Sequence, residues 1–198
     1  YYIIRYIDTV RSQEREKIEL AIKNKEMQMS LLKSQINPHF LFNTLNSIST
    51  LIHFSKDKAR KMISQLSDIF RYAMDSYDDQ LVDLSEEIDF IDNYVRIQQV
   101  RFEERLHFVK EIEEECLKTQ IPPMILQPLI ENAVKYGIGP KDEGGTIKLT
   151  AKRIVGGGVY FEVRDNGLGS LAAKVLDGSS SGIGMKNSEK RLQNIYGP

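Results

Sequence analysis

The chain has 198 residues, with 27 Lys and Arg against 28 Asp and Glu, a net charge of -1 and a single cysteine, Cys116. This balance excludes a surface that binds nucleic acid mainly by neutralising phosphates, and one cysteine excludes a disulfide framework. The length suffices for one large domain or two small ones, and no apolar run approaches the roughly 20 residues of a membrane-spanning helix.

The first third of the chain is rich in charge and follows a helical pattern. Its apolar seam, spaced as in a heptad repeat, consists of Ile18, Ile22, Met29, Leu32 and Ile36. Such a seam is buried against a partner helix and predicts a short coiled coil. A surface helix that packs within its own domain is the alternative interpretation.

A helical hairpin is predicted next. Pro38 lacks an amide donor and disfavours helix at Asn37, so a helix either restarts here with Asn37 as its cap or kinks. Ser55 is expected to cap the second helix. The two apolar faces comprise Leu41, Leu45, Ile48 and Ile52, and then Ala59, Met62, Ile63, Leu66, Ile69, Phe70 and Ala73. Because two such helices do not bury both faces alone, we expect a second copy to complete a four-helix bundle.

The second half predicts a mixed α/β domain. Ser85 is expected to cap a helix, and a further helix over Met124–Tyr136 is expected to end at Gly137 in the left-handed conformation. Strands are predicted over residues 106–112, 146–154 and 159–165, with a hairpin turn at the three consecutive glycines 156–158. A last helix carries Met185, Leu192 and Ile195. We therefore expect an antiparallel sheet covered by helices.

Three segments of this half carry residues suited to a nucleotide site. In the first, Glu131–Tyr136, the amide oxygen of Asn132 is a hard ligand suited to Mg²⁺ that is held mainly by phosphates and water. Lys135 follows one turn later on nearly the same face, where it can meet a phosphate charge. On its own, Glu-Asn-Ala on a helix is ordinary surface composition.

The second segment, Asp165–Gly169, follows directly on a strand. Asp165 has the parity of Val163, so its carboxylate is expected to point to the buried face, where it needs a donor such as the adenine amino group. Gly167 and Gly169 allow a sharp turn and a close approach to a ligand. A plain Asp-Asn-Gly turn is the alternative interpretation.

The third segment, Gly182–Asn187, is a glycine-rich loop that leads into a helix through Gly184. Free amides at a helix start, together with the helix dipole, make an anion site. Each segment alone is weak evidence, but the three in this order and spacing are specific.

These segments resemble the N box and the two glycine boxes of the gyrase/histidine-kinase/MutL-type ATPase fold. The stretch Gln35–Asn46, which reads QINPHFLFNTLN, resembles the phosphoacceptor region of LytS-type sensor histidine kinases. Leu84–Glu87 and Ile121–Asn132 fit the same family. The resemblance implies a dimeric helical domain, an α/β domain that binds ATP and Mg²⁺, and phosphoryl transfer to a response regulator receiver domain.

Carried over by position, the resemblance implies that His39 is the phosphoacceptor, that Asn132 binds Mg²⁺ and that Asp165 binds adenine. The other ATP-binding positions are Lys135, Tyr136, Gly167, Gly169, Gly182 and Gly184. On a helical wheel His39 lies opposite the predicted apolar stripe and faces solvent. Asn43 shares its face, where other histidine kinases often carry a residue that orients water to dephosphorylate the regulator. A packing role across the dimer is the alternative for Asn43.

Some positions depart from the commoner pattern of histidine kinases. Many carry an acid directly after the histidine, where this chain has Phe40, so the general base is unassigned and Glu131 is a candidate. Tyr136 stands where LytS-type sequences often have histidine. A nucleotide-sensing dimer without phosphotransfer is the main alternative; an anti-sigma-type serine kinase or a structural coiled coil would explain less of the chain.

The expected organisation has three parts. Residues 1–30 form a signalling coiled-coil helix, residues 31–79 the dimerisation and phosphotransfer helices, and residues 80–198 an ATP-binding α/β sandwich whose last strands are missing. The chain starts at Tyr1 rather than Met, so we expect the cytoplasmic portion of a bacterial membrane sensor whose anchor precedes this fragment.

Overall fold

The computed structural model describes residue 14 and residues 37–76, 79–168 and 183–197. The chain divides into two compact units, Tyr1–Asn46 and Ser47–Pro198. The predicted coiled coil lies outside the described residues, and so do Gly169 and Gly182. Among the helices that the structure describes, none combines the length and the apolar character needed to cross a bilayer.

Helix α2 spans Pro38–Phe54 and begins where the sequence predicts. The Asn37 side chain accepts the backbone N–H of His39 at 3.0 Å, which satisfies one of the free amides of the first turn. The prediction of Asn37 as the cap and Pro38 as the first helical residue is therefore confirmed.

The buried face of α2 differs from the predicted stripe. Leu45 and Ile52 are 49% and 50% exposed, whereas Thr44 is only 2% exposed. Thr44 tolerates burial because its hydroxyl donates to the Phe40 carbonyl at 2.7 Å. The side chains buried on α2 are Phe40, Thr44 and Ile48. Leu45 and Ile52 of the predicted apolar face therefore lie outside the core of the single chain.

Helix α3 spans Lys56–Asp75 after Ser55, which stands at the predicted cap position without a side-chain cap hydrogen bond. It packs against α4, Leu84–Phe102. The buried side chains of α3 are Ala59, Met62, Gln65, Leu66, Ile69 and Ala73. Of the predicted apolar face, Ile63 lies outside this core at 47% exposure.

The cap of α4 corrects the prediction at Ser85, because the capping residue is Asp83. Asp83 donates its backbone N–H to the Glu86 carboxylate at 3.4 Å, as in a capping box. Asp83 also lies in strand β1, Val82–Asp83, which pairs antiparallel with β3, Gln120–Ile121. The short β1–β3 pair therefore fixes where α4 begins.

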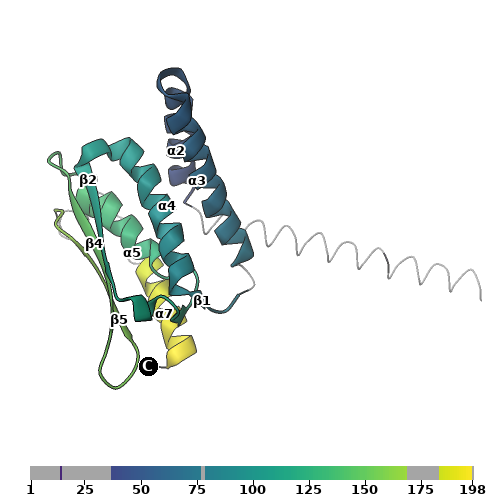
Figure 1. Ribbon diagram of the computed structural model, residues 1–198, viewed down its shortest axis with the longest axis vertical. Helices are drawn as coiled ribbons and strands as arrows, with labels where there is room; N and C mark the ends of the chain where they lie inside the picture. The colour runs from purple at the N-terminus through teal and green to yellow at the C-terminus, as the bar shows by residue number, and fades with distance from the viewer. Residues whose placement is uncertain (1–13, 15–36, 77–78, 169–182, 198) are drawn as a thin grey trace, which may run out of the picture. The chain divides into compact units, whose positions relative to one another are not determined.

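The main sheet has the order β2-β4-β5, with β2 at Leu106–Ile112, β4 at Gly145–Arg153 and β5 at Val159–Asp165. Strands β4 and β5 form the predicted hairpin, but β2 and β4 run parallel, so the expectation of an antiparallel sheet was wrong for this pair. A parallel pair needs a crossover, which here includes a helix. Helices α4 and α5 lie on one side of this sheet (Figure 1).

The crossover contains α5, Gln127–Asn132, which continues directly into a π-helical segment, Ala133–Ile138. Gly137 lies inside that segment and has no positive φ, so the prediction of a left-handed cap was wrong. The last helix, α7, spans Ile183–Tyr196 and packs against α5.

Candidate nucleotide site and phosphoacceptor helix

The predicted nucleotide residues of the first segment sit where α5 changes into the π-helical segment. Asn132 is the last residue of α5, and Lys135 and Tyr136 follow within the wider turn. Lys135 Nζ lies 2.8 Å from the Tyr136 hydroxyl and 4.5 Å from the centre of its ring. Tyr136 thus holds the Lys135 ammonium group beside the helix. The π-helical turn itself is also informative, because single-turn π-helical segments are frequent at functional sites.

Glu131, the candidate base, is engaged on its own helix. Its carboxylate accepts a hydrogen bond from Gln127 Nε2 at 2.8 Å. Burial raises the pKa of Tyr94 on α4, and the charge of Glu131 raises it further, so the carboxylate lies close to this phenol. These contacts orient Glu131 within the domain.

The first and second segments interlock through two glycines. A Cβ atom on Gly137 would lie 2.5 Å from Asp165 Oδ1, and one on Gly167 would overlap the backbone of Gly137. Asp165 Oδ1 accepts the Gly167 N–H at 2.9 Å, and the Gly137 carbonyl accepts the Leu168 N–H at 3.2 Å. Because Gly137 and Gly167 have no side chains, the end of β5 can lie directly against the π-helical segment.

Asp165 itself is exposed, which corrects the expectation of a buried carboxylate. Val163, two residues earlier, is half-buried, so the inward face of β5 opens toward solvent as the strand ends. The carboxylate consequently has its donor in the Gly167 amide and remains accessible to a ligand.

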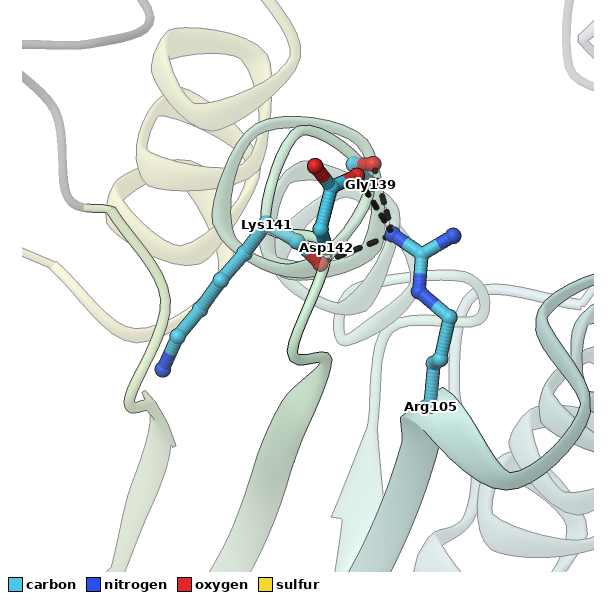
Figure 2. Close-up of polar contacts among 4 residues, drawn as sticks. All are labelled: Arg105, Gly139, Lys141 and Asp142. Atoms are coloured by element: carbon cyan, nitrogen blue, oxygen red, sulfur yellow. Dashed lines mark hydrogen bonds and ion pairs between the residues drawn. The ribbon is translucent and has the colours of Figure 1, made fainter.

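Arg105 was not predicted, and it holds the segment that follows the π-helical turn (Figure 2). Its Nη2 donates to the carbonyl of Lys141 at 2.7 Å and to that of Gly139 at 3.5 Å. Asp142 Oδ1 lies 4.0 Å from the same nitrogen. Arg105 precedes β2 directly, so it links the start of the sheet to the exit of the candidate nucleotide helix.

Asn166 was likewise not predicted. Its Oδ1 accepts the backbone N–H of Thr146 at 2.7 Å, and its carbonyl accepts a hydrogen bond from Lys141 Nζ at 3.1 Å. Asn166 thereby ties the loop after β5 to the start of β4. The Asp-Asn-Gly order in the sequence signals a turn, but not these contacts.

The third segment is described only in part. Gly184 lies in the first turn of α7, while Gly182 precedes the described residues. Farther along α7, Arg191 Nη1 donates to the Pro123 carbonyl at 2.8 Å, and the Tyr196 hydroxyl donates to the Gln120 carbonyl at 2.7 Å. These two bonds fix α7 to the chain that leads into α5.

The phosphoacceptor candidate lies in the other unit, on the first turn of α2. His39 is exposed, and the Nδ2 atom of Asn43 lies 3.2 Å from its Nδ1 and 3.3 Å from its Nε2. The amide can therefore donate to whichever ring nitrogen carries no proton. The predicted shared face of His39 and Asn43 is confirmed.

No group of three or more His, Cys, Asp and Glu side chains in the described part of the chain could hold a metal ion. Mg²⁺ keeps several waters and is usually bound by phosphates together with one or two protein oxygens. Asn132, which is half-buried and directly precedes the π-helical segment that contains Gly137, is such an oxygen donor.

Residues 27–106 match the family described as Histidine kinase. The chain is 37% identical over 184 residues to the sensor histidine kinase YesM of Bacillus subtilis, covering 92% of this chain and 31% of the relative. It is 30% identical over 202 residues to the sensor protein LytS of Enterococcus faecalis, covering 96% and 34%. A histidine kinase domain from Erythrobacter litoralis is similar with a TM-score of 0.44 at 11% identity, covering 84% of this chain and 82% of that chain.

Residues 27–106 thus match the histidine kinase family, and over more than nine-tenths of its length the chain is similar to sensor histidine kinases. The similarity extends to the sensor protein LytS. The chain spans about a third of the length of YesM and LytS.

Proposed function

We propose that this chain is the kinase core of a two-component sensor, which phosphorylates His39 from ATP and Mg²⁺ and passes the phosphoryl group to an aspartate of a response regulator. The observation that carries this proposal is the cradle formed by Gly137, Asp165 and Gly167. It brings a carboxylate and a glycine turn against the helix that bears Asn132, as a nucleotide site requires.

In the proposed site Asp165 binds the adenine amino group, and Tyr136 lies beside the ring. Asn132 would hold Mg²⁺, which when bound neutralises charge on the phosphates. Lys135 meets a phosphate oxygen. The amides around Gly167, Gly169, Gly182 and Gly184 contribute the remaining phosphate contacts.

The proposed reaction needs little from the protein beyond positioning. The unprotonated ring nitrogen of His39 attacks the γ-phosphorus, the bond to the β–γ bridging oxygen breaks, and ADP leaves. The other ring nitrogen carries the proton, which is then lost to solvent or to a base. The Asn43 amide, 3.2 Å from Nδ1, can donate to the unprotonated nitrogen in the resting side chain, so this hydrogen bond opens before the attack. Glu131 is the candidate base that takes the proton of His39. In the separate dephosphorylation of the regulator, Asn43 would orient the attacking water.

Dimerisation is part of the proposal. Large apolar side chains remain exposed on the two hairpin helices, namely Phe42, Leu45, Ile52 and Phe54 on α2 and Ile63 and Met74 on α3. A four-helix bundle with a second copy would bury them. We further propose that residues 1–30, 31–79 and 80–198 act as signalling helix, phosphotransfer hairpin and ATP domain on the cytoplasmic side of a membrane sensor.

The test is incubation of the full-length protein with γ-labelled ATP and Mg²⁺, scoring acid-labile phosphate. His39→Gln should abolish labelling. His53→Gln is the matched control, because His53 is also exposed and lies on the same helix. Asn132→Ala should reduce labelling by weakening binding of the ATP–Mg²⁺ complex. Nucleotide binding without any labelling would instead favour a nucleotide-sensing dimer.

A further inference from the structure

Glu87 is a fully buried carboxylate on α4 with 0% exposure. It accepts hydrogen bonds from the Met124 N–H at 2.7 Å, the Leu126 N–H at 2.9 Å and the Tyr72 hydroxyl at 2.7 Å. Burial raises the pKa of Glu87, while these donors oppose the shift. The buried Glu87 carboxylate is therefore a shared acceptor for three donors, and each donor comes from a segment other than α4.

The Glu87 carboxylate holds Met124 and Leu126, which directly precede the candidate nucleotide helix α5. Met124 has a φ of 57°, a left-handed conformation that a residue other than glycine keeps only where its surroundings enforce it. Residues 121–127 are all buried, and α5 begins at Gln127. Because Asn132 lies within that short helix, we expect a change at Met124 to shift the helix and with it Asn132.

The third donor, Tyr72, belongs to α3 of the helical hairpin. Its hydroxyl and the Met124 N–H bind the same atom, Glu87 Oε2. The Tyr72 ring lies 5.0 Å from the ring of Phe90 on α4. A shift of α3 along α4 therefore acts on the oxygen that holds Met124.

We infer that Glu87 is a positioning residue for the nucleotide site, and that the Tyr72–Glu87 hydrogen bond couples the hairpin helix α3 to the helix bearing Asn132. The consequence for catalysis rests on the proposed function, but the coupling itself does not. The contact between α3 and the nucleotide site would thus consist of one phenol, Tyr72, and one carboxylate, Glu87, inside the protein.

Two variants test the positioning role of Glu87 and the coupling through Tyr72 separately. Glu87→Gln replaces one acceptor oxygen by an amide donor that faces the backbone N–H groups, so ATP affinity should fall tenfold or more. Tyr72→Phe removes one atom and leaves Glu87 bound to Met124 and Leu126. It should change ATP affinity by less than threefold but slow His39 phosphorylation at saturating ATP by fivefold or more.

Ile69→Val is the matched control, because Ile69 lies one turn before Tyr72, is 2% exposed and loses only a methyl-sized group. It should lower the melting temperature as Tyr72→Phe does, with binding and phosphorylation each within twofold of the parent. A Tyr72→Phe protein whose kinetics match those of Ile69→Val would overturn the coupling. Unchanged ATP affinity in a folded Glu87→Gln protein would overturn the positioning role.

Hydrogen exchange at Met124 and Leu126 gives a readout that requires no kinase activity. Tyr72→Phe should speed exchange of the Met124 amide at least fivefold relative to Ile69→Val. If the parent protein forms no phosphohistidine, the proposed function fails, whereas the exchange result still decides the link. Equal exchange in both variants would reject it even in an active kinase.

Discussion

Replacing Gly137 by alanine would place a methyl group 2.5 Å from Asp165 Oδ1, whereas ordinary contact begins near 3.4 Å. The helical backbone of Gly137 has no positive φ, so alanine fits its conformation and gains helix propensity of about 1 kcal/mol. The conflict is therefore confined to the Asp165 carboxylate, which must retreat by about 0.9 Å. That movement breaks its 2.9 Å hydrogen bond from the Gly167 N–H.

The cost differs between folding and binding. Because Asp165 is exposed, water can solvate the displaced carboxylate, so the net hydrogen-bond loss to folding is about 1 kcal/mol and roughly cancels the gain in propensity. For adenine, a displaced carboxylate loses a charge-assisted hydrogen bond of about 1.5–3 kcal/mol. Each 1.4 kcal/mol is about a tenfold change in affinity, so ATP should bind at least tenfold more weakly.

Calorimetric titration with a non-hydrolysable ATP analogue, together with a thermal melt, measures both effects. Gly156→Ala is the matched control, since its Cβ would meet nothing within 4 Å but its φ of 97° strains alanine. That variant should lose about 1–2 kcal/mol of stability and keep its ATP affinity. If Gly137→Ala binds ATP as tightly as the parent, the Gly137–Asp165 cradle does not form the adenine site.

Three further outcomes are expected. Asp165→Asn should weaken ATP much more than GTP by calorimetry, and equal losses for both nucleotides would remove Asp165 from base recognition. Asn43→Ala should largely spare autophosphorylation of His39 and slow dephosphorylation of the regulator; parallel losses of both rates and of dimer stability would make Asn43 structural. Thr119→Val should stabilise the protein by about 1 kcal/mol, since the Thr119 hydroxyl is buried without a hydrogen-bond partner among the described residues; a lower melting temperature in calorimetry would contradict this.

The local elements could be predicted because local signals define them. The helix start at Pro38 follows from Asn37 as a cap, and β4 and β5 follow from alternating residues on either side of three glycines. The shared face of His39 and Asn43 follows from helical spacing alone. The pairing of β2 with β4 is different, because β4 lies beyond helix α5 in the sequence and no local pattern specifies that the two strands run parallel.

The sequence suggests which residues form the candidate site, but it does not reveal the residues that hold them in place. Glu87 sits among Ser and Glu residues at a helix start, a context that indicates a solvated face, yet it is fully buried. Its donors are two backbone amides and one phenol, which are distant in sequence and leave no local signature. The role of Arg105 could not be predicted for the same reason, since its partners are backbone carbonyls.

Arg105 allows two kinds of interaction to be compared at one side chain. Its ion-pair partner Asp142 lies 4.0 Å away, and the Asp142 side chain is fully exposed, so this pair should contribute little. Its hydrogen bond to the Lys141 carbonyl is 2.7 Å long and part-buried, and a bond from a charged donor contributes about 1.5–3 kcal/mol. The carbonyl contact should therefore outweigh the ion pair.

Arg105→Lys keeps the charge but loses the planar fork, so it should lower the stability by about 1–2 kcal/mol and the melting temperature by about 2–8 °C. Asp142→Asn should change the melting temperature by less than about 1 °C, because a 4.0 Å pair to a fully exposed carboxylate falls at the low end of the roughly 0–1 kcal/mol that exposed ion pairs contribute. Since the Gly139 and Lys141 carbonyls follow the helix that bears Asn132, ATP affinity should also fall severalfold in Arg105→Lys alone. Thermal melts in low and high salt test this comparison. If Asp142→Asn lowers the melting temperature as much as Arg105→Lys does, and high salt abolishes that difference from the parent, Arg105 acts through the Asp142 carboxylate.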